Sequence, residues 1–217
     1  MEPKKGIELV NTGKSSEVSI TIGNTTLKHA GVPAGVRFEQ ETAFVYLAID
    51  TSNSMAGLKL EQAKKGCIAF SKDAFSKGYQ VGLIGFGYNA KHICAPTSDS
   101  RELEGHIKNM QADGSTNMAE AIKMAHYHLD KKDKTRVIVI ATDGRPDSKR
   151  NALKEAEKAK ADGIDIITIG TDDAEQDFLK KLATRAELSS KVTKEVFSQA
   201  ISDASLLLPP PRSITRQ

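Results

Sequence analysis

Four short apolar segments stand out in the pattern of hydrophobic and polar positions along the chain. Each is rich in β-branched residues, and none alternates cleanly with polar residues. They cover residues 44–49, 81–86, 136–141 and 164–169. Strands that are buried on both faces, as in a parallel sheet covered by helices, have this composition. We therefore predict four central strands, with residues 90–94 as a short antiparallel edge strand close behind the second.

Helical patterns lie between these segments. Leu60, Ala63, Cys67, Phe70 and Ala74 recur at intervals of three and four, so they share one face of a helix. Similar patterns predict helices at residues 100–110, 118–129, 173–183 and 193–207. A narrower stripe of Leu153, Ala156 and Ala159 predicts another, Lys- and Glu-rich helix that ends at Asp162-Gly163. Strands that alternate with helices form βαβ units, whose right-handed crossovers place helices on both faces of a sheet. The expected fold is an open, doubly wound and mostly parallel α/β sheet flanked by helices.

The N-terminal region does not follow this alternation. Val18, Ile20 and Ile22 alternate with polar residues ahead of a Gly-Asn pair, and residues 25–28 can pair back along them. This pattern predicts a β-hairpin. We accordingly divide the chain into an N-terminal extension with the hairpin (1–40), an α/β domain (41–208) and a Pro-rich, basic tail (209–217), which we expect to be extended.

The composition indicates which class of protein the chain belongs to. Hydrophobic residues make up 39% of the 217 residues and charged residues 27%, which is typical of a soluble globular domain. The net charge of +3 is too small to indicate a nucleic-acid partner, and the basic residues between 149 and 160 are interleaved with glutamates. No apolar run is long enough to span a bilayer or to form the core of a signal peptide. We expect a cytoplasmic protein with no nucleic-acid or membrane partner.

The cysteines and histidines do not predict a zinc site. Cys67 and Cys94 are expected to be reduced and buried. The five histidines lack the clustered spacing of zinc ligands. His126 and His128 are two residues apart in a predicted helix, so they do not share a face.

Polar residues gather where the predicted strands end. Asp50 follows the first central strand, and Ser52 and Ser54 come after it at intervals of two, which lets their side chains point the same way in an extended segment. Asp143 follows the third central strand, and Thr116 lies in the loop before a predicted helix. Open α/β sheets usually bind ligands at the carboxyl ends of their strands. We therefore expect these five side chains to converge there.

Three hydroxyls and two carboxylates are hard oxygen donors. They suit Mg²⁺, or alternatively Mn²⁺ or Ca²⁺, better than zinc or copper. Two carboxylates just balance the charge of a divalent cation, so a metal held by them would still attract a carboxylate from outside. The expected partner is a protein that presents an Asp or Glu side chain.

The five residues resemble the metal-ion-dependent adhesion site (MIDAS) of von Willebrand factor A domains. The motifs are Asp50-x-Ser52-x-Ser54, Thr116 in a Gly-Ser-Thr-Asn loop, and Asp143 in Thr-Asp-Gly. All five positions carry the residue types of that family. The resemblance implies a Rossmann-like sheet with the metal at its edge, bound directly by the hydroxyls and directly or through water by the carboxylates. It also implies a non-enzymatic protein-interaction module, here of the intracellular, stand-alone type.

Two other functions fit parts of the pattern. Asp50 after an apolar strand could be the nucleophile of a Mg²⁺-dependent aspartate-based phosphatase. Such enzymes usually carry a second aspartate two residues later, where this chain has Ser52. The chain could also be a metal-independent scaffold that binds its partner through the hairpin or the helical surface.

Overall fold

The structure is a computed structural model that describes residues 18–22, 25–29, 37–129 and 134–216. The chain separates into two compact units, Gln40–Arg212 and a smaller unit made of Met1–Glu39 and Ser213–Gln217. Among the described residues, no helix combines the length and the apolar composition that crossing a bilayer requires.

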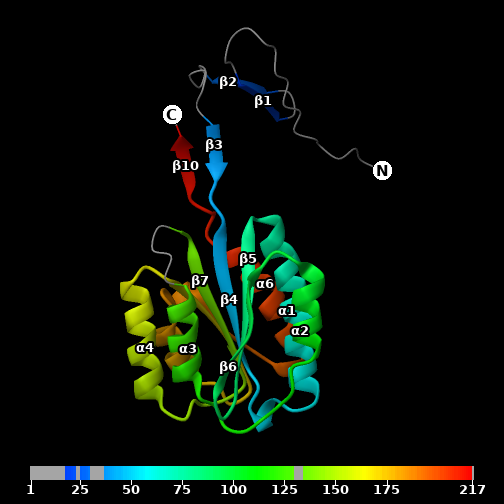
Figure 1. Cartoon of the computed structure of the whole chain (residues 1–217), viewed down its shortest axis with the longest axis vertical. Helices are drawn as coiled ribbons and strands as arrows, with labels where there is room; N and C mark the ends of the chain where they lie inside the picture. The colour runs from blue at the N-terminus through cyan, green and yellow to red at the C-terminus, as the bar shows by residue number, and fades with distance from the viewer. Residues whose placement is uncertain (1–17, 23–24, 30–36, 130–133, 217) are drawn as a thin grey trace. The chain divides into compact units, whose positions relative to one another are not determined.

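The larger unit is built on a six-stranded sheet with the order β6-β5-β4-β7-β8-β9. Its strands are β4 Ala43–Asp50, β5 Tyr79–Phe86, β6 Ala90–Thr97, β7 Arg136–Thr142, β8 Asp165–Thr171 and β9 Ser189–Val192. β4 is central and pairs in parallel with β5 and β7, and β8 and β9 continue the sheet in the same direction. Of these six strands, β6 alone runs antiparallel, against β5. This confirms the predicted α/β sheet with an antiparallel edge strand (Figure 1).

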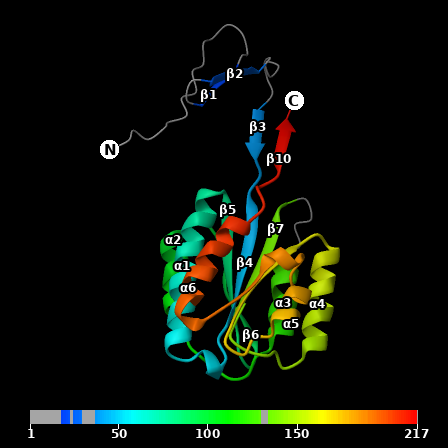
Figure 2. The same cartoon turned by 180° about the vertical axis from the view of Figure 1, so that it is seen from behind.

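Helices cover both faces of the sheet, as Figures 1 and 2 show from opposite sides. One face is covered by α1 Leu58–Ser76, α2 Ser100–Lys108 and α6 Phe197–Asp203. The other face is covered by α3 Met118–His128, α4 Lys149–Ala161 and α5 Gln176–Leu182. Short 3-10 turns lie between these elements, namely η1 Asn53–Met55, η2 Ala186–Leu188, η3 Lys194–Val196 and η4 Ala204–Leu207. The sheet is therefore doubly wound, as the alternation of strands and helices predicts.

Two apolar cores, one on each face of the sheet, explain why the central strands lack polar alternation. In β4, Val45 and Leu47 pack into the core beneath α1, whereas Tyr46 and Ala48 pack into the core beneath α3 and α4. All 8 residues of β4 are buried. Successive side chains of a strand point to opposite faces, so a strand covered on both sides needs apolar residues at almost every position.

The structure differs from the sequence prediction at the C-terminal helix and at one edge of the sheet. The apolar pattern predicts a single helix over residues 193–207, whereas the structure has η3, α6 and η4 in succession. Phe197 and Ile201 are fully buried, but Val196 in the same predicted stripe is 49% exposed, so the packed helix is shorter than the stripe. The edge strand β9 has the sequence Ser-Ser-Lys-Val, whose single apolar residue gives no strand pattern.

The described part of the smaller unit consists of paired strands. β1 Val18–Ile22 pairs antiparallel with β2 Thr25–His29, as the alternation of apolar residues predicts. β3 Arg37–Gln40 is hydrogen-bonded to β10 Ser213–Arg216.

The predicted extended tail is divided between the two units. Residues 209–212 belong to the larger unit, where the Tyr79 hydroxyl donates a hydrogen bond to the carbonyl of Pro209 at 2.5 Å. Pro211 is buried, and Ser213–Arg216 forms a strand instead of a free tail. A proline-rich composition predicts extended backbone but carries no information about the contacts that hold it.

Gly82 in β5 marks a close approach between neighbouring strands. A Cβ atom there would lie 2.4 Å from Cε1 of the fully buried Tyr46 ring. Gly82→Ala is expected to lower the free energy of unfolding by about 1–3 kcal/mol. Gly105→Ala is the matched control, because a Cβ at that helical site meets nothing within 4 Å, and alanine favours a helix by about 1 kcal/mol. Chemical denaturation measures both, and equal stability of the two variants would contradict this packing.

Candidate metal centre

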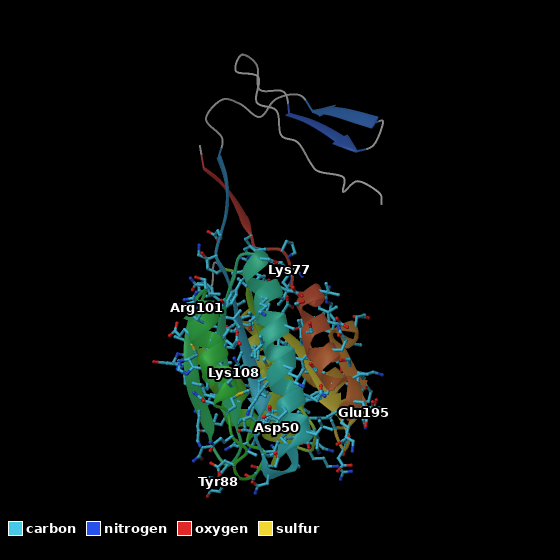
Figure 3. The ribbon with its side chains drawn as sticks, turned by 90° about the vertical axis from the view of Figure 1, so that its right-hand side faces the viewer. Asp50, Lys77, Tyr88, Arg101, Lys108 and Glu195 are labelled. Atoms are coloured by element: carbon cyan, nitrogen blue, oxygen red, sulfur yellow. The ribbon has the colours of Figure 1, made fainter. Side chains whose placement is uncertain are left out.

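The polar residues singled out from the sequence lie where parallel strands end. Asp50 is the last residue of β4, and Asp143 directly follows β7, which pairs in parallel with β4. The carboxyl ends of parallel strands meet at one edge of a sheet, where open α/β sheets bind ligands. In Figure 3, Asp50 and Tyr88 lie toward this edge, and Lys77, which caps the far end of α1, lies toward the opposite edge.

Asp50 is fully buried and is hydrogen-bonded through both carboxylate oxygens. Oδ1 accepts from the backbone N–H of Ser52 at 2.8 Å, and Oδ2 accepts from the hydroxyl of Thr142 at 2.5 Å. Burial raises the pKa of Asp50 to about 6; the hydrogen bonds from Thr142 and Ser52 oppose this shift, and the negative charge of Asp143 adds to it. A cation close to this carboxylate would stabilise its charged form.

A chain of hydroxyls connects Ser52 with Asp143. The Oγ atoms of Ser52 and Ser54 are 3.0 Å apart, and the Ser54 hydroxyl donates to Oδ1 of Asp143 at 2.8 Å. Ser52 and Asp143 are buried and Ser54 is exposed, so the cluster is accessible to solvent from the side of Ser54. The structure thus brings four of the predicted donors into one polar cluster, namely Asp50, Ser52, Ser54 and Asp143.

The fifth predicted donor, Thr116, lies in the loop that precedes α3. Backbone hydrogen bonds hold this loop against the loop that follows β4. Asp113 N donates to the Thr51 carbonyl at 2.6 Å, and Asn53 N donates to the Gly114 carbonyl at 3.0 Å. Thr116 is itself buried, with 8% of its surface exposed. These bonds place it beside the loop that carries the two serines.

Asp147 is a further residue of the site that the sequence motifs do not indicate. Its carboxylate accepts hydrogen bonds from the backbone N–H of Thr116 at 3.1 Å and from the hydroxyl of Ser115 at 3.0 Å. Its own N–H donates to the Thr116 carbonyl at 3.1 Å. Asp147 therefore ties the Thr116 loop to the loop of Asp143. An aspartate in a polar loop has no distinctive sequence signal, because turns and helix caps favour it as well.

Lys59 brings a positive charge to the cluster. Its ammonium group donates to Oδ2 of Asp143 and lies 3.0 Å from Oδ2 of Asp172, which follows β8 with a left-handed φ of 48°. Burial alone would lower the pKa of Lys59, but hydrogen bonds to Asp143 and Asp172 and their charges raise it above its ordinary value. The sequence analysis does not single out Lys59, because its role depends on contacts with residues distant in the sequence.

The donor set fits a hard divalent cation. The cluster offers oxygen atoms only, from hydroxyls and carboxylates. Mg²⁺, Mn²⁺ and Ca²⁺ prefer such ligands, whereas soft metals favour nitrogen and sulfur. The contact between Lys59 and Asp143 shows that the cluster attracts positive charge.

Comparison with known proteins assigns the sequence to one group of domains. The family model of the von Willebrand factor type A domain matches residues 45–204. Inter-alpha-trypsin inhibitor heavy chain H4 of Sus scrofa is 26% identical over 155 residues, which are 64% of this chain and 17% of that protein. A UPF0353 protein of Mycobacterium tuberculosis is 28% identical over 165 residues, which are 66% of this chain and 49% of that protein. The chain therefore spans at most about half the length of these two curated relatives.

Solved structures share the fold at lower sequence identity. The vWF domain of the type V pili tip protein Mfa5 from Porphyromonas gingivalis has a TM-score of 0.70 at 15% identity, covering 78% of this chain and 95% of that one. Manganese-loaded TRAP protein of Plasmodium vivax has a TM-score of 0.68 at 17% identity, covering 83% and 80%. Proximal thread matrix protein 1 from the mussel byssus, with a zinc-occupied MIDAS motif, has a TM-score of 0.67 at 18% identity, covering 82% and 48%. These similarities establish the fold of the domain.

The buried Asp50 carboxyl group predicts a pH-dependent stability in protein that a chelator keeps free of metal. Its pKa is about 6 in the folded chain against an ordinary value of 3.8, so the folded state binds more protons between these values. The free energy of unfolding therefore falls by roughly 3 kcal/mol as the pH rises through this window. The side chain of Asp50→Asn does not titrate, so the free energy of unfolding of this variant does not fall in the same way. The difference between the variant and the wild type is therefore expected to shift in favour of the variant by roughly 3 kcal/mol between about pH 4 and pH 7.

Chemical denaturation across this pH range measures the difference. Asp177→Asn, which changes an exposed carboxylate in α5, is the matched control and is expected to follow the wild-type curve. A difference between Asp50→Asn and the wild type that stays constant with pH would contradict the shifted carboxyl group.

Lys59 and a divalent cation would compete for Asp143. Lys59→Met removes the ammonium group and is expected to tighten Mn²⁺ binding about five- to tenfold, because a partly exposed ion pair contributes about 1 kcal/mol. Calorimetric titration with Mn²⁺ measures the affinity. Lys64→Met is the control, since Lys64 lies on the same helix but pairs with Glu61. Weaker Mn²⁺ binding by Lys59→Met would mean that Lys59 supports the site and does not compete for it.

Proposed function

The chain belongs to the von Willebrand factor type A domain family, and on this basis we propose that it is a metal-dependent protein-binding module and not an enzyme. Domains of this family generally mediate protein interactions and are usually not catalytic. The observation that carries the proposal is the oxygen cluster at the carboxyl edge of the sheet. In it, the buried carboxylates of Asp50 and Asp143 lie with the hydroxyls of two serines.

Five side chains would hold the metal. The hydroxyls of Ser52, Ser54 and Thr116 and the carboxylates of Asp50 and Asp143 supply hard oxygen donors, with Ser54 on the exposed side. A divalent cation bound there would supply a Lewis-acidic centre that attracts a carboxylate from another molecule. The burial of Asp50 and Asp143 favours such binding, because a cation offsets the cost of keeping two carboxylates out of water.

Mg²⁺ is the proposed metal, with Mn²⁺ and Ca²⁺ as alternatives. Metals of this class prefer oxygen ligands, and the cluster offers no other donor type. Two proteins with the same fold support the capacity for divalent ions, since TRAP protein is manganese-loaded and proximal thread matrix protein 1 has a zinc-occupied MIDAS motif.

The proposed partner is a protein that presents an Asp or Glu side chain. Leu58, which precedes Lys59 at the start of α1, is 58% exposed, and Tyr88 is 69% exposed. The backbone N–H of Tyr88 donates to the Asp113 carbonyl at 3.3 Å, which places Tyr88 next to the Thr116 loop. Exposed aromatic and large apolar side chains beside a polar centre are typical of protein interfaces. They favour a protein partner over a free acidic metabolite.

The phosphatase alternative is less well supported. Its nucleophile must reach a phosphorus atom, whereas Asp50 is 0% exposed and both of its oxygens accept hydrogen bonds. A metal-independent scaffold differs from the proposal in one measurable respect, the dependence of partner binding on metal. The cytoplasmic location expected from the sequence stays a prediction.

Immobilised peptides with a central Asp or Glu, each matched by an Asn or Gln peptide, test the proposed function. In Mn²⁺ the acidic peptides are expected to bind at least about tenfold more tightly than the amide peptides, because a carboxylate can complete the coordination of the metal. EDTA and the variant Asp143→Ala are both expected to abolish this difference. Tyr88→Ala is expected to weaken peptide binding while leaving the affinity for Mn²⁺ unchanged.

Two results would contradict the proposed function. Undiminished binding of the acidic peptides in EDTA would favour the metal-independent scaffold. Hydrolysis of phosphate esters in Mg²⁺ that is lost in Asp50→Asn would favour the phosphatase.

A further inference from the structure

A second group of side chains of the types that bind metals lies where α2 meets β6. Cys94 comes from β6, and Glu102 and His106 come from α2. Their ligand atoms, a sulfur, a carboxylate oxygen and an imidazole nitrogen, all lie within 4.8 Å of one another. None of these residues belongs to the oxygen cluster at the carboxyl edge of the sheet.

The helix presents its two ligands on one face. Glu102 and His106 are spaced at i and i+4, so their side chains lie one turn apart on the same side of α2. Each is followed by a buried residue, Leu103 and Ile107, whose burial fixes the rotation of α2 against the sheet. The carboxylate of Asp99 caps the start of the helix. Both ligands are therefore held on a packed element and not on a loop.

The strand carries an irregularity on each side of the cysteine. Between the pairs Val81↔Thr97 and Leu83↔Cys94, β6 advances three residues while β5 advances two. Between Leu83↔Cys94 and Ile84↔His92, β6 advances two residues while β5 advances one. Such bulges re-aim side chains and are common next to functional sites. Here Cys94 lies between the two shifts, with its sulfur within 4.8 Å of the ligand atoms on α2.

We propose that Cys94, Glu102 and His106 bind a Zn²⁺ ion. A thiolate, an imidazole and a carboxylate are ligand types that zinc takes in proteins, and they select it over Mg²⁺ and Ca²⁺. The thiolate and the carboxylate together neutralise the charge of the ion. Zinc bonds of about 2.0–2.3 Å in a tetrahedron put ligand atoms ~3.5 Å apart, which small side-chain rotations from the present positions would achieve. Three protein ligands leave the fourth position for water or another ligand.

A neighbouring hydroxyl orients the carboxylate ligand. Thr97 donates to Oε2 of Glu102 at 3.0 Å, and its oxygen accepts from the backbone N–H of Asp99 at 3.0 Å. The second hydrogen bond fixes the hydroxyl, so its proton points at the glutamate. Carboxylates that bind metals usually have such a partner, and its loss typically costs about 10–100-fold in metal affinity.

Metal binding at this group displaces a proton. The Cys94 thiol donates to the Ala95 carbonyl at 3.2 Å. Zinc binds the thiolate, so a zinc–sulfur bond forms as the thiol proton leaves to the solvent. Access to the group is open, because Glu102 is exposed and His106 lines a cavity of about 540 Å³.

A zinc ion at this position would join α2 to the edge strand. β6 is the outermost strand of the sheet on that side, and its pairing with β5 is irregular. Binding to the folded chain alone raises its stability by mass action. Zn²⁺ is thus expected to raise the Tm of Asp143→Ala, whose oxygen cluster is disrupted, and to leave that of the double variant Cys94→Ser/Asp143→Ala unchanged.

Titration of the metal-free, reduced full chain with Co²⁺ tests the proposal. Co²⁺ replaces Zn²⁺ in such sites, and a cobalt–thiolate bond gives a charge-transfer absorption in the near ultraviolet. The band is expected in the wild type and is expected to disappear when Zn²⁺ displaces Co²⁺. Cys94→Ser abolishes it, and Glu102→Gln, which changes an exposed residue and preserves the fold, weakens Co²⁺ binding. Thr97→Val is expected to weaken it about 10–100-fold.

Two control variants test whether the absorption band comes from Cys94 and not from another part of the chain. Cys67→Ala removes the other cysteine, which is fully buried in α1, and is expected to keep the band. Asp143→Ala disrupts the oxygen cluster and is also expected to keep it, so the outcome is independent of the proposed function. No band in the folded wild type, a band that survives in Cys94→Ser, or Co²⁺ binding that only Asp143→Ala removes would overturn the proposal.

Discussion

The free-energy cost of burying two carboxylates at the ends of parallel strands determines which contacts surround the oxygen cluster. Asp50 and Asp143 are 0% and 2% exposed, and burial raises the pKa of Asp50 to about 6. A buried carboxylate is tolerated only where hydrogen bonds or a cation compensate for lost water. Thr142 donates to Asp50, while Ser54 and Lys59 donate to Asp143. Each of these contacts compensates in part for the water that the carboxylates lose on burial, and a bound divalent ion would compensate more fully.

The fold makes this concentration of charge feasible. Parallel pairing of β4 with β7 brings both strand ends to one edge, and backbone hydrogen bonds join the loop that follows β4 to the loop before α3. Asp147, in the loop that follows β7, bonds to the backbone of Thr116 and so links its own loop to the loop before α3. The proposed zinc ligands lie instead between α2 and β6, and their sulfur and nitrogen atoms differ in hardness from the oxygen cluster. This difference favours Zn²⁺ at the second group and Mg²⁺ at the oxygen cluster.

Local sequence patterns predict most of the fold and most residues of the oxygen cluster. The strands and helices follow from apolar runs and from intervals of three and four, because burial imposes those periods directly. Asp50 and its two serines follow from their spacing after a strand. Lys59 and Asp147 could not be predicted in this way, since each acts through contacts with loops distant in sequence. The group at Cys94 joins α2 to β6 at two irregularities of strand pairing, which have no sequence signature.

Calorimetric titration of metal-free protein with Mg²⁺ and Mn²⁺, beside the double variant Asp50→Ala/Asp143→Ala, tests the central claim most directly. The oxygen cluster predicts saturable binding to the wild type and none to the double variant, with both proteins folded by circular dichroism. Equal binding by the two proteins, or no binding by a folded wild type, would contradict a metal centre built on these two carboxylates.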